Sequence, residues 1–449
     1  MLSAQDTQLL TRVGPGAPMG DLLRRYWNPA LMSSELPAPD CTPIRVKLLG
    51  ENLVAFRDTS GRVGLIADRC PHRGASLFFG RNEDDGLRCV YHGWKYDVEG
   101  RCLDMPNEPE ESRFKDKFRH IAYPCVERAG MVWTYMGPLA LKPPFPEYPW
   151  NLVPDDHVEV SKRVIQNNWM QSLEGGIDSS HVAYLHNEGG GQRQIRNANS
   201  ATQNLTRQDT APRFELMEIP AGVLIAAQRN APEDRYYWRI NIFMLPFWTA
   251  PPGGIGPATR LTAWEPMDDF TLMRWNIYFN PERPLTPEER AQCHQVGGVD
   301  LGNEEYLPPT TQPGGAFHGI RNEENDYMID RELQRTQSFT GIVGIGTQDQ
   351  AMTETMKTDN LGPILNRTLE HLGTSDSGVI AARRILLRAA RKLRDENVAP
   401  PGTGDPSVFR YTAAGIVLPR QESWVEAARS FFAAPKAMSA WPSEGQRWR

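Results

Sequence analysis

Short hydrophobic runs separated by turn-forming residues dominate the stretch from residue 44 to residue 138. Turn signals such as Asp58-Thr-Ser-Gly61 and Asp97-Val-Glu-Gly100 fall between the runs. We interpret as strands residues 45–49, 52–56, 63–67 and 131–136. The pattern predicts a small antiparallel β domain.

The sequence on either side of this stretch has a different pattern. Helical patterns occur at residues 6–12 and 19–26, and the Pro-rich tract 142–149 is a stiff boundary. Beyond it, strand patterns alternate with helical ones, and one helix has a clear start signal in Thr286 followed by Pro287. We expect strands at 158–165, 214–217, 223–228, 236–243, 261–264 and 272–278, and helices at 286–296, 348–356 and 379–395.

These patterns predict an α+β protein with more than one core. A chain of 449 residues and 50.6 kDa is long enough for two or three cores. We expect a helical segment at 1–40, the β domain at 41–140 and an α+β domain at 141–449.

Composition excludes several function classes. The formal net charge of −6 and the pI near 5.9 give no basic surface for nucleic acid or anionic lipid. No run approaches the roughly 20 apolar residues of a membrane helix. The six cysteines show no disulfide framework and no signal peptide is apparent, so we expect a cytoplasmic protein. A strand followed by Gly-x-Gly-x-x-Gly is missing, so we expect no NADH or flavin site here and electrons supplied by another protein.

Two segments pair a cysteine with a histidine. Cys70-Pro-His72 and Cys89-Val-Tyr-His92 are separated by 16 residues. Two thiolates and two imidazoles, one of each in both halves, suit a [2Fe–2S] cluster with cysteines on one iron and histidines on the other. The pattern therefore predicts a Rieske centre on the loops of the β domain.

Zinc and a disulfide are the alternatives for these four residues. Structural zinc sites favour Cys-x2-4-Cys and His-x3-5-His halves, whereas each half here is mixed. A disulfide between Cys70 and Cys89 fits poorly with a reducing compartment. Both alternatives are weaker than the Rieske interpretation.

A second constellation of possible ligands lies in the segment Asn168 to His186. Asp178 and His181 would share one face if the segment is helical, whereas His186 must lie past the helix end or on a bulge. One more carboxylate would complete a 2-His-1-carboxylate site for non-haem Fe(II) and O₂. Asp349, at the head of an expected helix, is the candidate, and Glu354 is the competing ligand.

The sequence resembles a known family over nearly its whole length. It is similar to the oxygenase components of Rieske non-haem iron aromatic ring-hydroxylating systems, and most of all to the phthalate 4,5-dioxygenase branch. The matching stretches are 70–77, 89–96, 173–181, 325–332 and 346–354.

The resemblance implies a fold, cofactors and partners. The fold would be an antiparallel β Rieske domain inserted near the N-terminus of a helix-grip catalytic domain, with His181, His186 and Asp349 holding mononuclear iron. The oligomer would be a homotrimer or a stacked pair of trimers, fed by a separate NADH- and flavin-dependent reductase with its own iron–sulfur centre. Asp178 would bridge the Rieske ligand His92 of one subunit to an iron-ligating histidine of the next.

The resemblance also implies an activity, which is O₂-dependent hydroxylation of an aromatic ring, with cis-dihydroxylation of a phthalate or benzoate as the leading hypothesis. A Rieske monooxygenase or O-demethylase is the rival enzyme, and an electron-carrying Rieske protein without oxygenase activity is the rival from another class. An aromatic carboxylate would need arginine in an otherwise apolar pocket. Arg207 and Arg239, on strand-like stretches, are the candidates.

Overall fold

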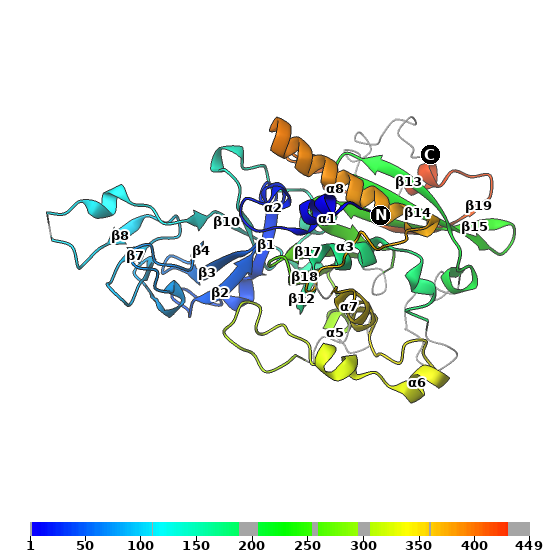
Figure 1. Ribbon diagram of the computed structural model, residues 1–449, viewed down its shortest axis with the longest axis horizontal. Coiled ribbons are helices and arrows are strands. Elements are labelled where there is room, and N and C mark those ends of the chain that lie inside the picture. The colour runs from blue at the N-terminus through cyan, green and yellow to red at the C-terminus, as the bar shows by residue number, and fades with distance from the viewer. Residues whose placement is uncertain are drawn as a thin grey trace.

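A computed structural model describes residues 2–109, 111–187, 205–253, 259–294, 306–358 and 361–429. Four β-sheets and a set of surrounding helices build these parts of the chain. Figure 1 shows an elongated molecule with the small strands β7 and β8 at one end and the long strands β13 to β15 toward the other.

Three small antiparallel sheets build the N-terminal third of the molecule. In sheet order their strands are β2 (Ile44–Leu48), β3 (Glu51–Arg57), β4 (Val63–Ala67) and β9 (Ala122–Tyr123); β5 (Arg81–Glu83), β6 (Gly86–Arg88), β7 (Lys95–Tyr96) and β8 (Cys102–Asp104); and β1 (Trp27–Met32), β11 (Met131–Tyr135) and β10 (Cys125–Arg128). Trp133 of β11 stacks on Trp150 and Trp248, which joins this region to the large sheet.

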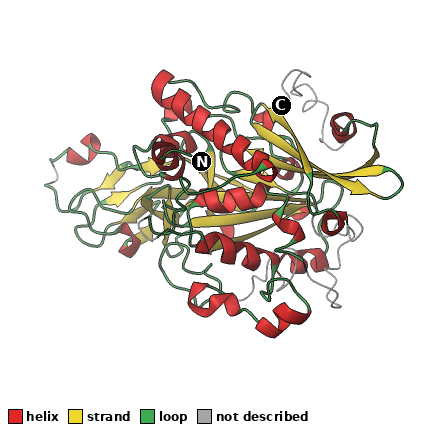
Figure 2. Ribbon diagram, turned by 45° about the vertical axis from the view of Figure 1, so that its right-hand side comes forward, coloured by secondary structure: helices red, strands yellow, loops and turns green. Residues whose placement is uncertain are grey.

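The large sheet has eight antiparallel strands. Its order is β12 (Val158–Ile165), β18 (Leu272–Phe279), β17 (Thr259–Pro266), β16 (Trp248–Ala250), β15 (Arg235–Met244), β14 (Gly222–Ala231) and β13 (Arg213–Ile219), with β19 (Ala414–Pro419) also paired to β15. Figure 2 shows its long strands running through the molecule with helices gathered around them.

The helices with described bounds are α1 (Ala4–Thr11), α2 (Pro18–Leu23), α3 (Trp169–Ile177), α5 (Pro287–His294), α6 (Arg331–Thr336), α7 (Ile345–Thr355), α8 (Ser377–Glu396) and α9 (Trp424–Ala428). Helix α3 lies between α7 and α8 and contacts both (Figure 1). Helices α1 and α2 pack against α8.

Glycines let α3 and α8 approach the same face of the large sheet. A Cβ atom on Gly176 of α3 would lie 2.8 Å from Thr249 Oγ1, and one on Gly378 of α8 would lie 2.9 Å from side-chain atoms of Ile225. Ile225 and Asn241 are paired neighbours on this face, and the Asn241 amide donates to the Ile177 carbonyl at 3.0 Å. The close approach fixes the C-terminal end of α3 on the sheet.

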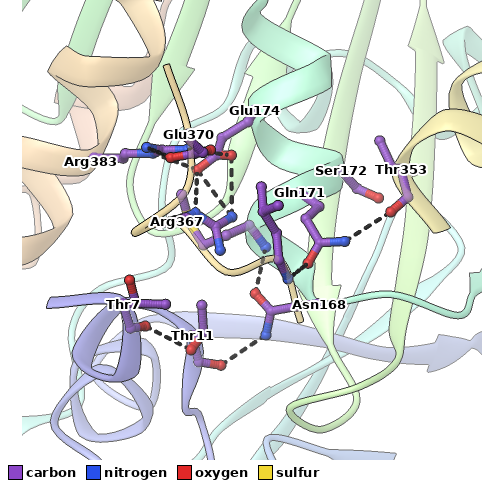
Figure 3. Close-up of polar contacts among 12 residues, drawn as sticks. Thr7, Thr11, Asn168, Gln171, Ser172, Glu174, Thr353, Arg367, Glu370 and Arg383 are labelled. Carbon is purple, nitrogen blue, oxygen red and sulfur yellow. Dashed lines mark hydrogen bonds and ion pairs between the residues drawn. The ribbon is translucent and has the colours of Figure 1, made fainter. Parts of the chain in front are cut away.

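Buried polar contacts hold α3 to the elements on both sides (Figure 3). The carboxylate of Glu174 accepts hydrogen bonds from Arg367 and Arg383, and Arg383 also pairs with Glu370. Arg367 is completely buried and Arg383 is 2% exposed. On the α7 side, the amide of Gln171 donates to the Thr353 carbonyl at 2.8 Å.

The structure confirms the predicted α+β class and most of the expected elements. The helix expected at 286–296 is α5, observed to His294, and its last two predicted residues lie outside the described parts. Helices expected at 348–356 and 379–395 begin earlier, at Ile345 and Ser377. The strands of the β5–β8 sheet were not expected, and neither were β1, β9, β10, β16 and β19. Most of these strands are too short to show a period, and β1 lies in the segment that was expected to be helical.

Within the described residues, every helix is too short or too polar to cross a membrane.

We expect the Glu174→Ala substitution to destabilise the protein by about 3–5 kcal/mol, because it leaves two buried guanidinium groups without their shared partner. Chemical unfolding followed by circular dichroism measures this change. The control Asp395→Ala removes an exposed ion pair with Arg394 and should leave the unfolding midpoint unchanged. Equal effects of the two substitutions would contradict the structural role of the network.

Candidate functional site: two metal centres

The Cys70 and Cys89 loops have the same backbone pattern. In each loop the cysteine carbonyl accepts from the amide of a glycine four residues later, Gly74 at 2.7 Å and Gly93 at 2.9 Å. Both glycines have positive φ, 78° and 79°, which favours glycine. In each loop the cysteine amide donates to the carbonyl five residues on, at 2.8 Å. Two matched loops therefore present one thiol and one imidazole each.

The thiols of this pair lie inside and the imidazoles lie toward the surface. Cys70 and Cys89 are buried, whereas His72 and His92 are half-buried, with ring centroids 4.4 Å apart. Trp94 stacks on His72 at 4.5 Å. The arrangement suits a cluster whose sulfur end is protected and whose imidazole end faces outward.

A tyrosine that sequence reasoning missed contacts one thiol. The hydroxyl of Tyr96 lies 3.4 Å from Cys70 Sγ. Burial and this contact raise the pKa of Tyr96, so the hydroxyl keeps its proton and can donate to a thiolate. All six cysteines are free thiols, which makes the disulfide interpretation wrong.

His181, His186 and Asp349 form the second group. Among the described residues, it is the only set that brings three such ligand atoms within 4.8 Å of one another. His186 Nε2 lies 3.1 Å from both His181 Nε2 and Asp349 Oδ1, and His181 Nε2 lies 3.6 Å from Asp349 Oδ1. The Cys/His loops show no such single-ion spacing, which favours a two-iron cluster over zinc there.

Hydrogen bonds on the far side of each ring determine where the protons lie. His181 Nδ1 is 3.0 Å from Asp178 Oδ2, and His186 Nδ1 is 2.8 Å from Gln348 Oε1. Both partners accept, so both Nδ1 atoms carry the proton and both Nε2 atoms hold a lone pair. Two lone pairs and a carboxylate oxygen thus converge on one point, and a cation fits there.

The pKa values in the metal-free chain reflect this convergence of electron pairs. Burial raises the pKa of Asp349, but the charge and hydrogen bond of His186, together with the charge of His181, lower it to about 2. Burial lowers the pKa of His181, but the Asp178 hydrogen bond and the Asp349 charge outweigh it and raise that pKa. A proton therefore competes with a metal ion for this site.

The expectation that Asp178 and His181 share a helix face is wrong. Helix α3 ends at Ile177, Asp178 is its C-cap, and His181 opens a short 3₁₀ helix, His181–Ala183. The two side chains meet because Asp178 also accepts from the backbone amides of Ser180 and His181, at 2.7 and 3.2 Å. His186 lies past the helix end, as expected.

Asp349 and Glu354 have different surroundings on α7. Asp349 lies in the second turn, not at the head of the helix, since α7 begins at Ile345. Glu354 lies outside the three-residue group, and its oxygens accept from the Gln166 amide and the Tyr327 hydroxyl, both at 2.7 Å. The geometry favours Asp349 over Glu354 as the third ligand.

Arginines gather on the site-facing side of the large sheet. Arg239 of β15 donates to Ser179 Oγ at 3.3 Å and to Asn241 Oδ1 at 2.6 Å, and Arg229, which sequence reasoning missed, donates to the Ser179 carbonyl at 2.7 Å. Burial and the Arg239 charge lower the pKa of Arg229 to about 10. Arg207 lies in a helical turn, 205–208, and not on a strand as expected.

Two family profiles match the chain. One, described as Rieske [2Fe-2S] domain, matches residues 26–124, and the other, described as LigXa C-terminal domain like, matches residues 134–442.

Curated relatives match nearly the whole chain. The 3-chlorobenzoate-3,4-dioxygenase oxygenase subunit of Comamonas testosteroni is 41% identical, covering 94% of this chain and 97% of its own. The phthalate 4,5-dioxygenase oxygenase subunit of Pseudomonas putida is 39% identical, and the match covers 91% of this chain and 90% of that protein. The 5,5'-dehydrodivanillate O-demethylase oxygenase subunit of a Sphingobium species is 31% identical, and the match covers 88% of this chain and 81% of that protein.

Solved structures share the fold. The terminal oxygenase of carbazole 1,9a-dioxygenase from Nocardioides aromaticivorans IC177 has a TM-score of 0.53 at 17% identity, over 87% of this chain and 98% of its own. A carbazole 1,9a-dioxygenase oxygenase solved in complex with ferredoxin has a TM-score of 0.52 at 18% identity, and the match covers 86% of this chain and 96% of that chain.

The chain therefore belongs to the Rieske non-haem iron oxygenases. It is an oxygenase subunit of the phthalate and chlorobenzoate dioxygenase type, an oxidoreductase whose cofactors are a Rieske [2Fe–2S] cluster and mononuclear iron, with O₂ as co-substrate. The resemblance inferred from the sequence is confirmed, and the hypothesis of an electron carrier without oxygenase activity is set aside.

We expect the affinity of the metal-free protein for Fe(II) to rise with pH between about pH 5 and 8. The raised pKa of His181 means that iron binding must release a proton, which changes the affinity by about tenfold per pH unit below that pKa. Anaerobic competition with a chelator across this range measures the change. An affinity that is independent of pH would contradict the assigned protonation.

Proposed function

We propose that His181, His186 and Asp349 hold the mononuclear iron and that the enzyme adds oxygen to an aromatic ring that bears a carboxylate. The observation that carries the proposal is the convergence of two imidazole lone pairs and one carboxylate oxygen. Such a set leaves coordination positions open, where the bound iron activates O₂. The chain's own residues orient the two rings, with Asp178 and Gln348 each holding a proton at Nδ1.

We propose that Cys70, His72, Cys89 and His92 hold the [2Fe–2S] cluster. The matched loops and the buried thiols support this assignment. The domain limits that we propose are 1–40 for the N-terminal segment, 41–140 for the Rieske domain and 141–449 for the catalytic domain. The N-terminal segment is not helical throughout, because its residues Trp27–Met32 form β1 and pair with β11.

In this proposal the cluster loops of one subunit would lie beside the iron ligands of a neighbouring subunit, and the cluster held by those loops would supply the electrons. The strands beside the cluster loops lie at the opposite end of the molecule from α6 and well away from α3 and α7 (Figure 1). Exposed apolar side chains occur at both ends, Val90 and Tyr91 beside the cluster ligands and Tyr184 and Phe339 beside the iron group. Patches of this kind favour contact between copies, so we propose a homotrimer, alone or stacked as two trimers.

Asp178 suits the role of bridge between the subunits. One carboxylate oxygen accepts from His181, and the side chain remains 24% exposed. A carboxylate oxygen accepts more than one hydrogen bond, so Asp178 can also accept from His92 of the next subunit. Its capping contacts at the end of α3 are compatible with this role.

The source of the electrons is a separate reductase in this proposal, carrying flavin and an iron–sulfur centre and oxidising NADH. The solved oxygenase–ferredoxin complex of a structural neighbour supports an electron-transfer protein as partner.

A carboxylate on the substrate is supported by the arginines on the site-facing side of the sheet. Arg239 and Arg229 enclose Ser179, directly after Asp178, and Arg239 is half-buried. Crowded, partly desolvated cations stabilise an anion. Arg207, half-buried in the helical turn 205–208, is the other candidate for this contact.

A monooxygenase or O-demethylase is the second candidate, because one relative is named as an O-demethylase. The metal ligands do not distinguish the two reactions, since the position of the substrate determines which atom is oxidised. Product analysis with a panel of phthalates, benzoates and methoxy-arenes, using a surrogate reductase, separates them.

His181→Ala or His186→Ala should lose the mononuclear iron and oxygenation while the red-brown cluster survives, since the cluster ligands lie on other loops. Iron analysis should fall from about three atoms per chain to about two. Asp349→Ala should have a similar, less complete effect, and Glu354→Gln is the matched control on the same helix. If Glu354→Gln removes the iron and Asp349→Ala does not, the third ligand is misassigned.

Asp178→Asn should keep both metal centres and the oligomer but slow electron transfer to the iron by orders of magnitude. The amide oxygen still accepts from the Ser180 amide, but the side chain is neutral and cannot bind two imidazole N–H groups equally well. Rapid-mixing oxidation of the reduced cluster, with substrate and O₂ present, measures the rate. A wild-type rate would limit Asp178 to a helix cap.

Arg239→Met or Arg207→Met should weaken the affinity for a phthalate roughly 10- to 150-fold, because a charged hydrogen bond contributes about 1.5–3 kcal/mol. The neutral diester should bind equally to wild type and variant. Arg235→Met, on the same strand and paired with Glu233, is the control. If neither variant alters discrimination between acid and ester, the carboxylate assignment fails.

A further inference from the structure

Gln348 connects an expected iron ligand to the backbone of a neighbouring loop. Its Oε1 lies 2.8 Å from His186 Nδ1, and its Nε2 lies 2.8 Å from the carbonyl oxygen of Ile342. Gln348 is 2% exposed, and both contacts are buried. Neither the sequence pattern nor the family comparisons assign it a role.

The contact with Ile342 determines how the amide is oriented. A backbone carbonyl only accepts, so the amide nitrogen of Gln348 must face Ile342 and the amide oxygen must face the ring. His186 must then donate from Nδ1, which leaves the lone pair of Nε2 directed at Asp349 and His181. The tautomer of His186 is thus set by a carbonyl that does not touch the ring.

The carbonyl of Ile342 is itself held in place. Ile342 packs with Tyr327 and Ala351 in a small buried cluster. Its backbone amide is also held in place, because it donates to Thr340 Oγ1 at 3.1 Å. Gly344, with φ of 92°, turns the chain into α7. Helix α7 contains both Asp349 and, one residue earlier, Gln348, whose amide orients His186.

We propose that Gln348 is a positioning residue that fixes the ring orientation and the tautomer of His186 for iron binding. The inference rests on the proposed assignment of His186 as an iron ligand. It makes the two histidines unequal, because His181 faces the charged carboxylate of Asp178 whereas His186 faces a neutral amide. A carboxylate partner makes an imidazole the more basic ligand, so His181 is the stronger donor of the pair.

Two substitutions at this position separate the positioning role from a merely structural one. Gln348→Met fills the space without a hydrogen bond, and Gln348→Glu keeps an acceptor for His186 but cannot donate to Ile342. If Gln348 positions the ring, the Met variant should raise the dissociation constant for Fe(II) roughly 10- to 100-fold. The Glu variant should bind Fe(II) at least as tightly as wild type, since a hydrogen bond to a carboxylate is stronger.

The measurement is anaerobic competition between the metal-free, cluster-containing protein and a chelator for Fe(II), so it does not depend on turnover. Gln350→Met is the matched control, a buried amide on the same helix that donates to Glu354 instead; it should leave the affinity unchanged. A Glu variant that binds no more tightly than the Met variant, or a Met variant that matches wild type, overturns the inference.

His186→Ala distinguishes failure of this inference from failure of the proposed iron site. If His186→Ala abolishes Fe(II) binding while Gln348→Met binds as wild type does, the site stands and the role of Gln348 is wrong. If His186→Ala leaves the affinity for Fe(II) unchanged, the assignment of the ligand itself is wrong.

Discussion

Three electron-pair donors with no proton among them must be held at one point, and much of the catalytic domain serves this constraint. Two of the donors follow the end of α3 and the third lies on α7, so the distance between these helices determines the site. Gln171 joins the helices through the Thr353 carbonyl, and Gly176 lets α3 rest on Thr249. A shift of either helix would separate the donors.

The two proposed metal centres are built in different ways. The cluster loops are short, matched turns whose geometry depends on local backbone hydrogen bonds and on glycines at positive φ. The iron group depends on contacts between residues far apart in sequence, such as His186 with Gln348 and Asp178 with the end of α3. Local chemistry thus specifies the first centre, and tertiary packing specifies the second.

This difference explains what could be predicted from the sequence. The Cys/His spacing was sufficient to predict the cluster, and the long strands and α8 were predictable because their periods extend over many residues. The sequence could not show that α3 ends at Ile177, since residues 178–186 retain helix-compatible composition. Gln348 and Arg229 carry no local signal, because their importance arises only when β14 and α7 meet the segment after α3.

The buried Glu174 network has a consequence for how the protein responds to heat. Hydration of charged groups becomes less favourable as temperature rises, so the cost of keeping Glu174, Arg367 and Arg383 away from water falls on warming. Hydrophobic contacts gain no comparable advantage at high temperature. The desolvation cost of the contacts that attach α3 to α8 therefore falls on warming, and these contacts hold the end of α3 that leads to the proposed iron ligands.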